Sequence, residues 1–154
     1  MDVSNWRKKY SFIISLSSLD EIKNIVYGNW KITGLTTAPI YAMDEEKIKS
    51  LIGSEIIYKR NILSIEHSKY IHHKTLDPEY DIRLLSELDF WKNNRGIFLE
   101  NIGIDKGLVI AVEVYNKNWE RYSGFGRRFW IKDENSLVIL WDGVYFDVKR
   151  ISDI

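Results

Sequence analysis

The stretch Gly28-Asn29-Trp30-Lys31-Ile32-Thr33 opens the first strand-like part of the chain, and Val148-Lys149-Arg150-Ile151 ends the last. Both stretches alternate with the two-residue period of a β-strand. That period places Trp30 on the inner face of the first strand and Arg150 on the inner face of the last one. An indole ring and a guanidinium group on core-facing positions suit a cation–π contact. The Trp30 and Arg150 pair therefore predicts that the first and last strands meet, and it says little about activity.

Further runs with the same period indicate strands along most of the chain. They cover residues 29–35, 55–60, 62–66, 69–74, 80–84, 108–115, 127–132, 136–141 and 144–150. Asp142-Gly143 is typical of a two-residue hairpin turn of type I′ between the last two strands. The sequence therefore predicts a mainly β, all-β fold, a single antiparallel up-and-down β-barrel of about eight strands.

Two or three short helices are expected beside the strands. Ser18-Leu19-Asp20-Glu21 forms a capping-box pattern, and Gly28 ends the helix that follows. A second helix, residues 45–52, is expected to cover one barrel mouth. Ser86 begins a helical turn, and we interpret residues 86–104 as an insertion at one end of the barrel.

Gly28-x-Trp30 answered by a late Arg150 resembles the closure signature of lipocalin-like (calycin) β-barrels. In that family the Trp ring packs across the closed end and the Arg lies against it, so the resemblance implies structural barrel closure by these three residues. The layout is also similar to uncharacterised lipocalin-like proteins of low-GC Gram-positive bacteria. The corresponding stretches are Asp44–Gly53, Ile56–Tyr58 and Asp142–Arg150. Relatives of this broad class bind hydrophobic compounds, and some are enzymes or protease inhibitors.

Length and composition limit the class of protein. A chain of 154 residues fits one domain, here residues 18–154, after an N-terminal segment of residues 1–17. Its 22 basic and 22 acidic residues give zero formal net charge, which argues against a dedicated nucleic-acid binder. The absence of cysteine excludes disulfides and thiolate metal sites. No apolar run reaches the ~20 residues of a membrane span.

The N-terminal segment leaves two interpretations open. Arg7-Lys8-Lys9 precedes residues 10–17 in the order of an export signal, although the apolar run within them is only about five residues, below the usual ~7–15. The segment is either a weak or trimmed export signal or a segment that packs on the barrel. The first interpretation favours an extracytoplasmic or cell-envelope location, and the second a cytoplasmic one.

Three arginines surround a glycine-rich turn. Arg121, Arg127 and Arg128 flank Ser123-Gly124-Phe125-Gly126, a pattern that could hold an anionic group. The alternative is a flexible hairpin at a barrel mouth. Aromatic residues of the predicted mouth loops could line a pocket with them, or could simply pack the barrel. The candidate ligand-binding residues are Trp91, Trp119, Arg121, Phe125, Arg127 and Arg128.

Other residues with reactive side chains form weaker patterns. His67, His72 and His73 lack a metal-binding spacing, and solvated strand histidines explain them more simply. Glu113 interrupts an apolar strand and is expected to point outward. Asp77, Glu79 and Asp81 are interpreted as loop residues near Pro78. No catalytic residue, metal site or cofactor is predicted.

Two functions follow from these expectations. The first is non-catalytic binding of a small hydrophobic or amphipathic molecule inside the barrel. The alternative is a protein-interaction or cell-envelope module whose barrel is plugged by its own side chains and acts through its surface. An enzyme would need Glu113, a histidine and an arginine in one cleft.

Overall fold

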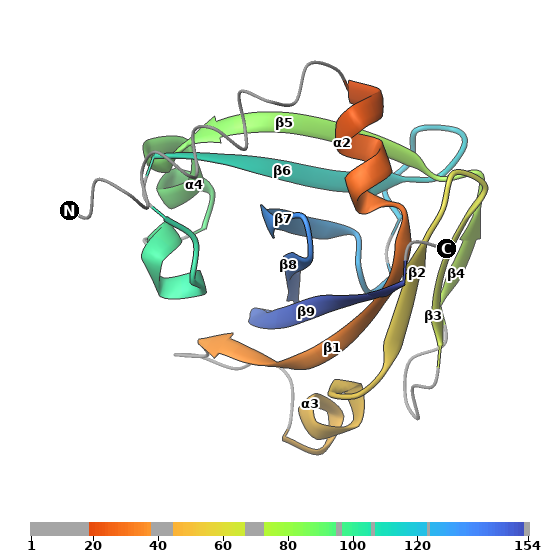
Figure 1. The fold of residues 1–154 in the computed structure, drawn as a ribbon, viewed down its shortest axis with the longest axis horizontal. Coiled ribbons are helices and arrows are strands. Elements are labelled where there is room, and N and C mark those ends of the chain that lie inside the picture. The colour runs from red at the N-terminus through yellow and green to blue at the C-terminus, as the bar shows by residue number, and fades with distance from the viewer. Residues whose placement is uncertain are drawn as a thin grey trace.

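Nine antiparallel strands form one strongly curled sheet in the computed structural model (Figure 1). The structure describes residues 19–37, 45–66, 73–94, 97–105, 107–122 and 124–152. The strands are β1 (Gly28–Thr37), β2 (Glu55–Tyr58), β3 (Ile62–Glu66), β4 (Lys74–Leu76), β5 (Glu79–Ser86), β6 (Leu108–Tyr115), β7 (Arg128–Asp133), β8 (Ser136–Trp141) and β9 (Val144–Ser152). Helices α2 (Leu19–Val26), α3 (Glu45–Leu51) and α4 (Glu87–Asn93) and the 3₁₀ turn η1 (Leu99–Ile102) lie around the sheet.

The strands follow an up-and-down order in which the last strand pairs with the first. In space the order is β4-β3-β2-β1-β9-β8-β7-β6-β5, so most strands lie beside their sequence neighbours and β9 lies beside β1. At the turn between β8 and β9, Asp142 and Gly143 have φ of 51° and 80°, as a type I′ turn requires. The predicted all-β, barrel-like fold is confirmed, with β4 and β5 as the two ends of the sheet's strand order.

The contact between Trp30 and Arg150 joins β1 to β9. The two residues are cross-strand partners, and Trp30 is fully buried. The indole Nε1–H donates to the carbonyl of Val26 at 2.9 Å, which ties β1 to the end of α2. The Arg150 guanidinium lies over the indole ring and donates to the carbonyls of Tyr27 and Ile25.

The main core lies on the concave face of the sheet. Large side chains from both halves of the sheet fill it, because strand alternation turns every second residue inward. Its fully buried members include Trp30, Ile32, Ile56, Tyr58, Leu63, Val114, Phe125, Phe129, Ile139, Phe146 and Val148. Helix α3 adds Ile48 and Leu51 to this core.

A second, smaller core lies on the opposite face of the same sheet. Phe90 of α4 and Leu99 and Ile102 of η1 pack there against Trp130 of β7 and other outward residues. The neighbours of Trp130 along β7, Phe129 and Ile131, belong to the main core, so the two cores share this strand. The sequence predicts that residues 86–104 are an insertion at one end of the barrel. In the structure, α4 and η1 of this segment pack on the outer face of the sheet.

Some expectations fall on residues outside the described ranges. These are the N-terminal segment of residues 1–17, the loop after Thr37, and His67 and His72. Within the described residues, no helix is both long and apolar enough to cross a membrane.

Candidate functional site

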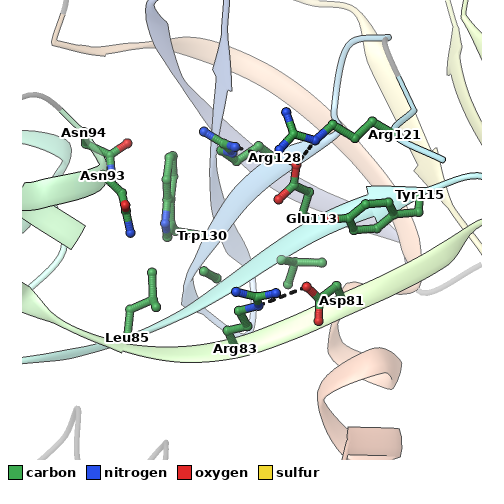
Figure 2. Close-up of a pocket in the computed structure, with 12 residues that line it drawn as sticks. Asp81, Arg83, Leu85, Asn93, Asn94, Glu113, Tyr115, Arg121, Arg128 and Trp130 are labelled. Carbon is green, nitrogen blue, oxygen red and sulfur yellow. Dashed lines mark hydrogen bonds and ion pairs between the residues drawn. The ribbon is translucent and has the colours of Figure 1, made fainter. Parts of the chain in front are cut away.

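A pocket of about 460 Å³ opens on the outer face of strands β5, β6 and β7, next to the C-terminal end of α4 (Figure 2). The residues that line it are Asp81, Arg83, Leu85, Asn93, Asn94, Ala111, Val112, Glu113, Tyr115, Arg121, Arg128 and Trp130. This volume lies within the range of small-molecule sites. The lining brings three guanidinium groups and two carboxylates together with an apolar wall.

Strand register explains why these residues meet. Asp81 of β5 is the direct cross-strand partner of Glu113 of β6, and Glu113 is the partner of Arg128 of β7. Side chains of such a row point to one face, with Cβ atoms about 4.5–5.5 Å apart. The row therefore forms a charged band across the pocket floor.

The neighbouring row forms a mixed wall. Arg83 of β5 pairs with Ala111 of β6, and Ala111 pairs with Trp130 of β7. Leu85 lines the pocket on the same side of β5. Ala111 is the smallest of these side chains, and it leaves room between its larger neighbours. Trp130 is almost fully buried in the second core, so the apolar surface beside the charged row comes mainly from half-buried Leu85 and Ala111.

Glu113 carries the most unusual electrostatics of the pocket. Its Oε1 lies 3.6 Å from Arg128 Nη2 and 4.0 Å from Arg121 Nε, both beyond hydrogen-bond distance. This oxygen is buried and has no hydrogen-bond partner among the residues that the structure describes. Figure 2 shows its carboxylate pointing toward the two arginines. Electrostatic attraction holds the three groups near one another without a hydrogen bond to this oxygen.

The second ion pair lies at the β5 wall. Arg83 Nε donates to Asp81 Oδ2 at 3.0 Å. The Arg83 side chain is 70% exposed and that of Asp81 is 28% exposed, so solvent screens this pair. Asp81 belongs to strand β5, as the strand predicted over residues 80–84 implies, and not to a loop near Pro78.

The α4 side of the pocket is rigidly held. Ser86 caps α4 by accepting a hydrogen bond from the Asp89 N–H. Asn94 is buried, its Nδ2 donates to the Phe90 carbonyl at 2.7 Å, and its Oδ1 accepts from the Tyr145 hydroxyl at 3.2 Å. Burial raises the pKa of Tyr145 to about 12, with Arg128 acting in the opposite direction, so this hydroxyl remains a donor at neutral pH.

The sequence-predicted ligand residues separate into four groups. Arg121 and Arg128 line the pocket, whereas Arg127 lines, with Arg128, an adjoining hollow of about 440 Å³ beside Trp141. Phe125 is fully buried in the main core.

The other two predicted ligand residues are exposed tryptophans outside this pocket's lining. Trp119 is 58% exposed and packs on Tyr115 with ring centroids 5.6 Å apart. Trp91 is 40% exposed and packs on Phe98 at 6.5 Å. The glycine-rich turn therefore supplies a core anchor, and the pocket arginines flank it, Arg121 in an isolated β-bridge with Tyr115, and Arg128 at the start of β7.

Most of the pocket was missed by sequence reasoning. Arg83, Leu85, Asn93, Asn94 and Tyr115 carry no motif. The available signal was strand alternation: outward positions of β5 and β6 carry Asp81, Arg83, Glu113 and Tyr115, which contrast with the apolar inward positions. To assign these positions to one site, one must also know which strands lie side by side.

His73 lies away from this pocket, in contact with main-core residues. Its Nδ1 accepts the Phe125 N–H at 2.9 Å, and its ring packs edge-on against Tyr122 and Trp141. The expectation of a solvated histidine is therefore wrong for His73, which is half-buried. The described residues contain no group of three or more His, Asp and Glu side chains suited to a metal ion.

Comparison of the chain with protein-family models, curated proteins and solved structures finds no match. Any functional conclusion therefore depends on the fold and on the geometry of the pocket.

Proposed function

We propose that this protein is a non-catalytic binding protein for a small amphipathic molecule, held in the pocket on the outer face of β5, β6 and β7. The anionic end of the ligand contacts Arg121 and Arg128, and its apolar part lies against Trp130, Leu85 and Ala111. In this proposal the lipocalin-like resemblance describes the architecture, and the binding site lies outside the barrel interior.

The observation that carries this proposal is the pairing of two guanidinium groups that have no hydrogen-bonded acceptor among the described residues with apolar surface in one pocket. The Arg121 side chain is 67% exposed and that of Arg128 33% exposed, and their contacts with Glu113 are 4.0 and 3.6 Å long. Guanidinium groups bind carboxylates and phosphates through short, paired hydrogen bonds. An anionic ligand would provide the acceptors that these two side chains lack.

The filling of the concave face supports a site outside the barrel interior. Inward positions carry fully buried Trp30, Tyr58, Phe129 and Phe146, which are among the largest side chains available. Aromatic side chains at these positions fill a small barrel, whereas small residues would leave space for a ligand. The location inside the barrel that the sequence favours is therefore replaced in this proposal by the outer pocket.

Native mass spectrometry of protein purified without detergent, followed by extraction of bound material, tests the proposal. A reproducible extra mass that is lost in Ala111→Trp is expected, because the indole would fill the pocket between Leu85 and Trp130. Lys31→Trp is the control, since it introduces the same indole at an exposed position of β1, away from the pocket.

Two outcomes would contradict the proposal. Bound material retained by Ala111→Trp would place the ligand elsewhere. Protein that carries no bound mass after expression in several hosts and growth media would favour the alternative. That alternative is a plugged barrel that acts through its surface as a protein-interaction or cell-envelope module.

A further inference from the structure

The pocket contains acceptors for a positively charged group as well as donors for an anion. Asp81 and Glu113 are direct cross-strand partners on its floor. Like charges that face one another across two strands destabilise a sheet unless cations compensate them. The three arginines of the lining balance these charges, but Arg121 and Arg128 lie beyond hydrogen-bond distance of Glu113 Oε1, whereas Arg83 donates a hydrogen bond to Asp81.

The buried Oε1 of Glu113 needs a hydrogen-bond donor. It is shielded from solvent and has no hydrogen-bond partner within the described part of the chain. A buried acceptor without a donor is costly, and native proteins leave few such groups unexplained. A ligand that donates an N–H to this oxygen would satisfy it. A simple anion would bring only further acceptors to the same place.

We propose that the ligand is a zwitterion of the α-amino-acid type with an apolar side chain, an inference that rests on the proposed function above. Its ammonium group lies between Asp81 and Glu113, and its carboxylate contacts Arg121 and Arg128. Its side chain packs against the wall formed by Leu85, Ala111 and Trp130.

The spacing of the charged row fits this assignment. Asp81, Glu113 and Arg128 stand on three adjacent strands, which lie about 4.8 Å apart. In an α-amino acid only one carbon atom separates the ammonium nitrogen from the carboxylate carbon. A single ligand can therefore contact the acidic and the basic end of the row at once.

Three probes that share one branched carbon chain test the assignment. L-leucine carries both charged groups, 4-methylpentanoate lacks the ammonium group, and 3-methylbutylamine lacks the carboxylate. Binding is followed on ¹⁵N-labelled full chain by NMR, through the Trp130 indole and the backbone amides of Ala111, Glu113 and Arg128. L-leucine is expected to bind about tenfold more tightly than either analogue, because each lacks one charge-assisted set of hydrogen bonds.

Charge-removing variants identify which residue contacts which group. Glu113→Gln should weaken L-leucine about tenfold and leave 4-methylpentanoate unchanged or tighter. Arg128→Gln should weaken 4-methylpentanoate and leave 3-methylbutylamine unchanged. Arg127→Gln is the matched control, because Arg127 lines the adjoining hollow and not this pocket. Asp81→Asn replaces Glu113→Gln if the latter lacks the dispersed spectrum of a folded chain.

The outcomes separate this inference from the proposed function. Equal affinity for L-leucine and 4-methylpentanoate would overturn the ammonium site and leave an anion-binding pocket. Unchanged leucine affinity in Glu113→Gln would overturn it as well. If none of the three probes shifts the pocket resonances, the amino-acid assignment is wrong, and the extraction experiment decides the proposed function separately.

Discussion

The guanidinium carbon of Arg150 lies 4.3 Å from the centroid of the Trp30 ring, and the two residues are cross-strand partners on β9 and β1. Arg150 also donates hydrogen bonds to the carbonyls of Tyr27, Ile25 and Glu134. One side chain thereby fastens the end of α2 and the β7–β8 turn to the strand pair that connects the two halves of the sheet. A single guanidinium performs this role because it has five donors in one plane.

Replacing Trp30 by Ala should destabilise the fold by about 3–5 kcal/mol, because it removes a fully buried indole and leaves a cavity in the main core. Urea denaturation followed by circular dichroism measures the change in free energy of unfolding. Trp119→Ala is the control, since its 58% exposed side chain should change stability by less than about 0.5 kcal/mol. A loss below about 1 kcal/mol for Trp30→Ala would show that the indole does not anchor the core.

Replacing Arg150 by Lys should cost about 1.5–3 kcal/mol, although the charge is kept. A lysine ammonium group cannot reach the carbonyls of Ile25, Tyr27 and Glu134 together while stacking on Trp30. Hydrogen exchange should show faster opening of α2 in this variant. A Lys variant as stable as the wild type would mean that charge alone stabilises this junction.

Gly126 should tolerate no side chain, in contrast to Gly34. Its φ is +88°, and a Cβ there would come within 2.7 Å of the Tyr58 hydroxyl and meet Ile56 as well. Gly126→Ala should therefore lower the thermal midpoint by several degrees, whereas Gly34→Ala, with open space around its Cβ, should change it little. Equal midpoints for the two variants would show that the turn after Phe125 adapts freely.

The protein should lose stability in alkaline solution. Burial raises the pKa values of Tyr58, Tyr80, Tyr122 and Tyr145, the last to about 12, above the usual value near 10. The unfolded chain then releases these protons at lower pH than the folded chain, so unfolding becomes easier as pH rises. This stabilising effect is complete below pH 10, and the part due to Tyr145 is lost between about pH 10 and 12.

Urea denaturation across this pH range, with tyrosinate absorbance as a second signal, measures the effect. Tyr145→Phe should flatten the pH dependence, and it also removes the hydrogen bond to Asn94. A free energy of unfolding that stays constant from pH 9 to 12 would show that the buried hydroxyls ionise equally in both states.

The fold was largely predictable because its determinants are local. Alternation identified the strands, Asp142-Gly143 identified the hairpin, and Trp30 and Arg150 fell on core-facing positions. The outer core was not predictable in this way. Periodicity alone did not decide between Phe129 and Trp130 as the inward residue of β7, and the structure places Phe129 inside and Trp130 outside.

The pocket was less predictable because its residues meet only through strand register. Arg121, Arg128 and Glu113 were identified individually, on a glycine-rich turn and on an apolar strand. Their convergence with Asp81 depends on β5, β6 and β7 lying side by side in one register, which a single sequence does not specify. Residue types indicated the chemistry, and pairing between distant strands determined the site.

Strands β7 and β8 are covered by one core on each face, which limits how this part of the sheet moves. Strand β7 contributes Phe129 and Ile131 to one core and Trp130 to the other, and β8 contributes Ile139 and Val138 in the same way. Amides in strands covered on both faces exchange with solvent only through the largest opening motions of a protein. The β7 side of the pocket therefore rests on a strand covered on both faces, whereas its opposite side rests on β5, at the end of the strand order. Under the proposed function, the Arg128 and Trp130 side is already ordered before a ligand binds, so little binding energy is spent on ordering it.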